Sequence, residues 1–177
     1  MIIPLADAQI VDPKITQADL DAFEAAIRQL TNNNFQNTRI RYVGLTFEAP
    51  ATIKLGTKAF GLRVGDTIQV SDSIYNDGLF TIKVVSDDAI EVDDAEFFEL
   101  ISKKAFVTKV EYPADIRRGV KAMIAYDKKM ARNIGTKSET ISRMSVTYYD
   151  VTSAESVSGY PATVMSFIDK YNKMRWG

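Results

Sequence analysis

Carboxylates are the side chains of this 177-residue sequence that come closest to a chemical cluster. Within one acidic stretch lie Asp87, Asp88, Glu91, Asp93, Asp94, Glu96 and Glu99. Carboxylate oxygens are the ligands that a hard cation such as calcium prefers, but this stretch lacks the EF-hand spacing. On a strand, neighbouring side chains would also point to opposite faces. We therefore expect a solvated, solubilising rim here and no metal site.

Histidine and cysteine are both absent from the sequence. Their absence excludes a Ser-His triad, an imidazole base, a thiolate nucleophile, disulfides and zinc or iron sites built on these residues. The sequence also lacks the glycine-rich dinucleotide fingerprint and the phosphate-binding loop. An enzyme would have to use carboxylates, lysine, tyrosine or an oxygen-ligated metal, and a cleft with paired carboxylates of separated pKa would identify it. We expect no cofactor, and binding rather than catalysis.

Charge is distributed unevenly along the chain although the net charge is only −1. Residues 1–112 carry 11 basic and 17 acidic side chains, a net −6, whereas residues 113–177 carry 11 and 6, a net +5. The small total argues against a dedicated nucleic-acid binder. The asymmetry favours a head-to-tail assembly in which a basic end meets an acidic surface, the alternative being unrelated solvated faces.

The composition and the first residues indicate a compact cytosolic product. A hydrophobic content of 46% is enough for one core or two small ones. The opening residues, MIIPLADAQIVDP, have no basic start and too short an apolar run for a signal peptide. Nowhere do 18 apolar residues follow one another, so no membrane span is expected.

The first regular element predicted is a helix over 17–31. Thr16 is the expected N-cap, with Asp19 completing a capping box. An apolar stripe recurs at helical spacing, and it consists of Leu20, Phe23, Ile27 and Leu30. The asparagines that follow Thr31 tolerate a left-handed conformation and end the helix.

From about residue 39 to 112 the apolar period changes from helical to the twofold period of strands. Candidate strands cover 39–47, 51–55, 66–71, 79–85, 89–92 and 104–112, and five or six short strands are expected. Asn76-Asp77-Gly78 closes a hairpin with residues that accept positive φ. Short strands at this spacing favour a closed barrel, because closure hides their edges. Its apolar face is expected to be Ile68, Val70, Phe80, Ile82, Val84, Phe106 and Val110.

A second helix is predicted over 114–133, with Pro113 before it and Gly135 beyond its end. Its apolar stripe is Ile116, Val120, Met123 and Ile124. Beside that stripe runs a basic edge of Arg117, Lys121, Lys128 and Arg132, which could face a neighbouring subunit, DNA in a channel, or only solvent.

A final helix is predicted from Pro161 to about Lys173, and we expect Val164, Phe167, Ile168 and Tyr171 to be buried together. After it come Met174, Arg175 and Trp176. Tryptophan and arginine are frequent interface hot spots, so this end suits docking into a partner's pocket. The alternative is that Trp176 folds back onto the protein's own core.

The order of elements from Tyr112 onward carries a resemblance to a known family. The sequence reads PADIRRGVKAMIAYDKKMARNIGTKSETISRMSVTYYDVT and then GYPATVMSFIDKYNKMRWG. This resembles the head-tail connector (adaptor, head-completion) proteins of tailed bacteriophages, in which a helix, a Lys-Ser-Glu stretch, a Ser-Val-Thr-Tyr strand and a Tyr-Pro helix with a basic aromatic tail follow one another. The stretch GLRVGDTIQVSDSIYNDGLFTIKVV also resembles small barrel modules of phage tail and connector proteins.

The resemblance implies an α+β fold with a three-helix connector core, residues 1–35 and 113–177, and an inserted SH3-like or similar small antiparallel β-barrel, residues 36–112. It implies a ring of about twelve copies in the virion neck, below the portal protein and above a stopper or tail-completion protein. Genomic DNA would pass through the channel without sequence-specific binding. The residues that dock onto the portal protein would be Tyr171, Lys173, Met174, Arg175 and Trp176. Two alternatives stay open, another tail-completion or baseplate protein and a small carboxylate-dependent enzyme.

Overall fold

The computed structural model describes residues 1–131, 138–141, 144–147 and 156–174. Its class is α+β, as predicted. The chain divides into two compact units. One contains Asn34–Glu111 together with Met1, and the other contains Ile2–Asn33 and Tyr112–Gly177. We refer to them as the barrel unit and the helical unit.

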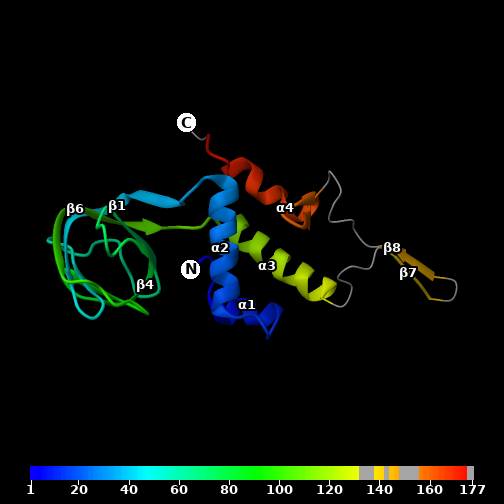
Figure 1. Ribbon diagram of the computed structural model, residues 1–177, viewed down its shortest axis with the longest axis horizontal. Coiled ribbons are helices and arrows are strands. Elements are labelled where there is room, and N and C mark those ends of the chain that lie inside the picture. Colours follow the sequence, from blue (N-terminus) through cyan, green and yellow to red (C-terminus); the bar gives the residue numbers. More distant parts are fainter. Residues whose placement is uncertain (132–137, 142–143, 148–155, 175–177) are drawn as a thin grey trace. The chain divides into compact units, whose positions relative to one another are not determined.

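Six antiparallel strands close into the predicted barrel, in the order β1-β2-β5-β4-β3-β6 with β6 returning to β1 (Figure 1). Their bounds are β1 Gln36–Glu48, β2 Thr52–Lys54, β3 Thr67–Ser71, β4 Gly78–Val85, β5 Ala89–Val92 and β6 Leu100–Val110. All six begin or end within a few residues of the predicted bounds. Tyr112, expected at the end of the last strand, lies beyond β6 and belongs to the helical unit.

The barrel core is built mainly from alternate residues of the strands. Ile68, Val70, Ile82 and Val107 are all at most 1% exposed. Phe97, from the connection between β5 and β6, is also buried, and its ring makes edge-to-face contacts with Phe47 at 5.4 Å and with Phe80 at 5.2 Å. Such aromatic pairs add to the free energy gained by burial alone.

Two residues assigned to the core from the sequence lie elsewhere. Val84 is 42% exposed, because a register irregularity between Ile82 and Val84 interrupts the alternation of β4. Phe106 is only partly buried, and the guanidinium of Arg41 lies 3.7 Å from its ring centroid. In β6 Ala105 and Val107, on either side of Phe106, are buried, so Phe106 lies on the other face. Thr108 and Val110 are buried as well, so the alternation of β6 is interrupted after Val107.

The predicted first helix matches α2 Gln17–Thr31. Thr16 and Asp19 form the expected reciprocal capping box, and Asn32 ends the helix in the left-handed conformation. Leu20 and Ile27 are fully buried, whereas Leu30 at the C-terminal end of the stripe is 38% exposed.

A shorter helix, α1 Leu5–Val11, precedes α2 and was not predicted from the sequence. It has seven residues and no side-chain cap at its N-terminus, so its own sequence gives it little stability. Contacts with α3 Ala114–Met130 stabilise it instead. Lys121 Nζ bonds Asp7 Oδ2 at 2.8 Å, and Lys128 Nζ donates to the Val11 carbonyl at 2.7 Å.

Helix α3 begins after Pro113 as predicted and buries the whole predicted stripe from Ile116 to Ile124. It ends at Met130, before the predicted residue 133, which lies outside the described residues. Gly119 is buried on the same face, and an ideal Cβ placed there would lie 2.4 Å from Phe167 Cδ1. The absence of a side chain at residue 119 therefore lets the Phe167 ring pack directly on the helix backbone.

The final helix differs from the prediction of one regular α-helix. It consists of one α-helical turn, α4 Ala162–Met165, followed by a 3₁₀ segment, η1 Ser166–Tyr171. Pro161 is the N-cap and pairs with Ser156 in the short antiparallel sheet of β9 Ser156–Val157 and β10 Tyr160–Pro161. Met165 and Ile168 are buried, and Val164, Phe167 and Tyr171 only partly. A second two-stranded sheet, β7 Ser138–Ile141 with β8 Met144–Thr147, lies in a stretch where one strand was expected.

Candidate functional site

The predicted docking segment at the C-terminus is held on the end of α2 as far as the structure describes it. The Lys173 N–H donates to the Thr31 carbonyl at 2.8 Å, and Asn32 Nδ2 donates to the Met174 carbonyl at 3.3 Å. These bonds use carbonyl and side-chain groups at the C-terminus of the helix. The Met174 side chain is 77% exposed. Arg175 and Trp176, the predicted anchors, lie outside the described residues.

A polar cluster at the start of α3 fixes Tyr171, the first residue of the predicted docking segment, together with Lys170 before it. Tyr171 Oη donates to Asp115 Oδ1 at 2.6 Å, and Lys170 pairs with the same carboxylate. Hydrogen bonds from Lys170 and from Tyr171 lower the pKa of Asp115 to about 2. The carboxylate is therefore charged at neutral pH and ties η1 to α3.

Of the residues in the predicted basic edge of α3, some are bonded to α1 and others are exposed to solvent. Lys121 and Lys128 bond α1, as described above. Arg117 and its neighbour Arg118 are exposed. Arg132 lies outside the described residues. Among the described residues of this edge, Lys121 and Lys128 are hydrogen-bonded to α1, whereas Arg117 is exposed and is not bonded to α1. Arg117 is therefore the described residue of this edge that is most accessible to a partner.

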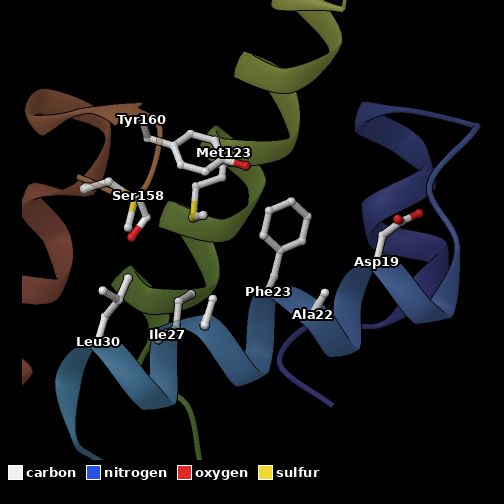
Figure 2. A pocket seen from close by; sticks show the side chains of 10 residues that line it. Asp19, Ala22, Phe23, Ile27, Leu30, Met123, Ser158 and Tyr160 are labelled. Carbon is white, nitrogen blue, oxygen red and sulfur yellow. The ribbon is translucent and has the colours of Figure 1, made fainter. Parts of the chain in front are cut away.

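An apolar pocket of about 270 Å³ lies in the helical unit between α2, α3 and the turn that joins β9 to β10. Figure 2 shows Phe23 and Ile27 of α2 and Met123 of α3 directed toward this space, with Tyr160 and Ser158 across from α2. The volume is slightly below the usual range for small-molecule sites, about 300–1,000 Å³. Its full lining is Asp19, Ala22, Phe23, Ala26, Ile27, Leu30, Met123, Ser158, Tyr160 and Met165.

The acidic and phenolic groups at this pocket are already engaged in structural bonds. Asp19 caps α2 through Thr16, and Tyr160 Oη donates to Asp127 Oδ2 at 2.6 Å. Burial raises the pKa of Asp127, and burial together with that bond raises the pKa of Tyr160. The pocket can therefore receive an apolar side chain, but it does not present an acid and a base aimed at a shared reacting atom.

A buried carboxylate that the sequence did not single out lies on α2. Glu24 is 4% exposed, and its Oε1 accepts a hydrogen bond from Tyr112 Oη at 2.8 Å. Arg28 Nη1 donates to the same phenol oxygen at 3.4 Å. Burial, then the charge of Glu24, raises the pKa of Tyr112. The three side chains form a largely buried polar network that ties α2 to Tyr112, two residues before α3, and this burial suits a structural role.

The described residues contain no group of three or more acidic side chains arranged to hold a metal ion. Among them no helix is both long and apolar enough to span a bilayer. No model of a known protein family matches the chain, and no curated protein matches its sequence.

Proposed function

We propose that this protein is a head-tail connector of a tailed bacteriophage, a structural virion protein that acts by binding rather than by catalysis. About twelve copies would form a ring below the portal protein, extend the DNA channel and offer a platform to a stopper or tail-completion protein. The virion neck is its proposed location after synthesis in the bacterial cytoplasm. No cofactor takes part.

The C-terminal segment carries this proposal. The backbone is bonded to the end of α2 through Lys173 and Met174, and the exposed Met174 immediately precedes Arg175 and Trp176. Because the chain is fixed on α2 up to Met174, less conformational entropy would be lost when this segment binds a partner. Tryptophan and arginine are the residue types that most often dominate such contacts.

The proposed architecture is a connector core of α2, α3 and the α4–η1 helix with the barrel inserted between α2 and α3. Two observations support it. The helical unit contains residues from both sides of the barrel unit in the sequence. The two ends of the barrel also meet, since the Glu111 N–H donates to the Phe35 carbonyl at 2.9 Å and Gln36 lies opposite Val110. An insertion with adjoining ends adds little loop-closure entropy to the host fold.

A different virion component, such as a tail-completion or baseplate protein, is the second candidate. The closed six-stranded barrel is the observation that favours it, because this module is the part of the chain outside the usual connector core. Such a protein would share the barrel but would not bind the portal. Portal binding is therefore the property that separates the two candidates.

Mass photometry of the full chain with and without purified portal protein tests the proposal. We expect monomers or weak oligomers alone and a ring-sized species on the portal. Trp176→Ala should weaken portal binding by about 2 kcal/mol if Trp176 is a buried anchor, without changing the melting temperature. Phe60→Ala, which removes an exposed aromatic ring of the barrel unit, is the matched control. Absence of any complex with portal would reject the connector function.

A further inference from the structure

Exposed hydrophobic side chains stand on two neighbouring loops at one end of the barrel. One loop, 72–77, joins β3 to β4, and the other, 93–99, joins β5 to β6. Tyr75 is 68% exposed and Phe98 is 66% exposed, and their ring centroids lie 5.6 Å apart. Ile74, beside Tyr75, is 82% exposed. We call these two loops the aromatic loop pair.

The aromatic loop pair is fixed by hydrogen bonds beneath its exposed rings. The side chain of Asn76, which is 4% exposed, bonds both backbone groups of Phe98. The Phe98 N–H donates to Oδ1 at 3.0 Å, and Nδ2 donates to the Phe98 carbonyl at 2.9 Å. Within the first loop, Ser73 and Asp77 bond each other through the Ser73 N–H at 2.7 Å. Rings on a fixed backbone lose little further entropy when a partner binds.

Ile74 occupies a backbone conformation that disfavours its own side chain. Its φ is +77°, in the left-handed region that β-branched residues rarely adopt. The hairpin was expected to place positive φ at Asn76, Asp77 or Gly78, whereas positive φ occurs at Asp72 and Ile74. The Ile74 side chain is largely exposed, so it gains little burial within this chain that could offset the cost of the strained backbone. Burial of this side chain against a second molecule would offset that cost.

Charge indicates the kind of molecule that fits. The aromatic loop pair carries six carboxylates and no lysine or arginine, and all six are exposed: Asp72, Asp77, Asp93, Asp94, Glu96 and Glu99. Lys83 reaches Asp93 at 4.0 Å from outside the pair, and Asp77 bonds Ser73. A cationic partner with a flat group to stack on Tyr75 and Phe98 satisfies both features. Arginine has that chemistry, and the barrel already contains it where Arg41 stacks on Phe106.

We infer that the aromatic loop pair of one copy binds helix α3 of a second copy of this chain, through Arg117 and Arg118. Helix α3 carries five basic and two acidic side chains. Its two arginines are exposed, whereas Lys121 and Lys128 bond α1. Two different surfaces meet in this contact, so it is heterologous and closes into a ring when repeated with the right rotation. The inference rests on the proposed function, and it names the surfaces that join neighbouring subunits of the proposed ring.

Site-specific photocrosslinking of the full chain tests the contact. A benzophenone amino acid replaces Tyr75, and ¹⁵N-labelled protein is mixed with unlabelled protein before illumination. We expect crosslinks between labelled and unlabelled copies, mapped by mass spectrometry to α3 peptides containing Arg117 and Arg118. The same crosslinker at Phe60, a comparably exposed ring, should not reach α3. Crosslinks confined to one copy, or an absence of crosslinks to α3, would overturn the inference.

Complementation between two variants gives an independent test by sedimentation velocity at low salt. Tyr75→Ser with Phe98→Ser removes one surface, and Arg117→Glu with Arg118→Glu removes the other. Each double variant alone should associate about 30-fold more weakly than wild type, the effect of losing one interface hot spot. Their mixture should form a one-to-one complex and nothing larger, because one intact pair of surfaces remains. A mixture as weakly associated as either variant alone would overturn the inference.

The Ile74→Asn variant distinguishes an effect on association from an effect on folding stability. Asparagine tolerates positive φ, so this variant should melt about 2–4 °C higher than wild type while associating more weakly. Equal or stronger association would count against the contact. Ring formation on portal by the Tyr75→Ser, Phe98→Ser variant would refute the inference and leave the connector function standing. Failure of wild-type protein to bind portal would instead reject the connector function, whatever the crosslinks show.

Discussion

Replacing Gly119 by alanine tests the packing that positions the C-terminal segment. An ideal Cβ at residue 119 lies 2.4 Å from Phe167 Cδ1 and Cε1 and 2.5 Å from Cε2. Ordinary carbon–carbon contacts are about 3.5–4.0 Å, so the ring must move by about 1 Å or more. The movement would displace η1 or turn Phe167 toward solvent.

Two opposing terms set the size of the effect. Forcing an extra methyl group into a packed contact costs about 1–3 kcal/mol. Alanine recovers about 1 kcal/mol of helix propensity relative to glycine. Because Phe167 is only partly buried, its ring can yield, and we take the middle of the first range. Gly119→Ala should then destabilise the helical unit by about 1 kcal/mol, against the stabilisation that propensity alone predicts.

The assay is urea unfolding followed by far-ultraviolet circular dichroism, in wild type and in a Phe167→Ala background. Removing the ring removes the clash, so Gly119→Ala should stabilise the second background by about 1 kcal/mol. Ala125→Gly, at an exposed position of α3, measures the propensity difference within the same helix. If Gly119→Ala stabilises both backgrounds equally, Phe167 does not pack on Gly119 and the described docking of η1 on α3 is wrong.

Three further predictions concern single features of each unit. Thr16→Ala removes the capping box of α2 and should cost about 1 kcal/mol by urea unfolding, whereas Thr57→Ala at an exposed loop position should change nothing measurable. Asp115 has a depressed pKa of about 2, so its charged form adds stability that is present above the unfolded pKa of about 3.9 and lost as pH falls toward 2. The melting temperatures of wild type and Asp115→Asn should therefore differ at pH 6 and converge near pH 2, and a constant difference would contradict this. A fragment of residues 34–111 should be soluble and melt cooperatively by calorimetry, and aggregation would show that the barrel needs the helical unit.

Features determined by local sequence could be predicted from the residues alone. The capping box of Thr16 and Asp19 involves residues three positions apart, and it marks the start of α2 to the residue. Pro113 marks the start of α3 in the same way. The strands of the barrel were located because twofold alternation and turn residues are also short-range signals.

Features determined by contacts distant in sequence could not be predicted. Helix α1 depends on Lys121 and Lys128, which follow it by more than a hundred residues. The placement of Phe106 depends on the register between β6 and its neighbours, where a shift of one residue reverses the faces. The 3₁₀ segment η1 follows one turn of α-helix, although its apolar spacing is compatible with a regular α-helix.

For the candidate interaction residues as well, local features could be predicted from the sequence and distant contacts could not. The basic edge was identified from helical spacing, but the spacing did not show that α1 occupies two of its lysines. Tyr75 and Phe98 lie 23 positions apart in the sequence, and their ring contact depends on Asn76. The sequence signal that could have identified the aromatic loop pair was the combination of Ile74, Tyr75 and Phe98 with six carboxylates and no cation.

The proposed insertion has a consequence for how the two binding surfaces can be separated. The barrel closes its own ends through the bond between Glu111 and Phe35, and its buried side chains form their own core. Substitutions in the aromatic loop pair therefore act on a different core from substitutions near Asp115 and Tyr171, and their effects on stability should add. Portal docking and the barrel's side of the subunit contact then become separable in one protein, whereas Arg117 and Arg118 lie in the helical unit with the docking segment. A variant of the aromatic loop pair should lose the subunit contact and keep portal docking, and a single substitution in that pair that abolishes both would indicate that the two units do not fold independently.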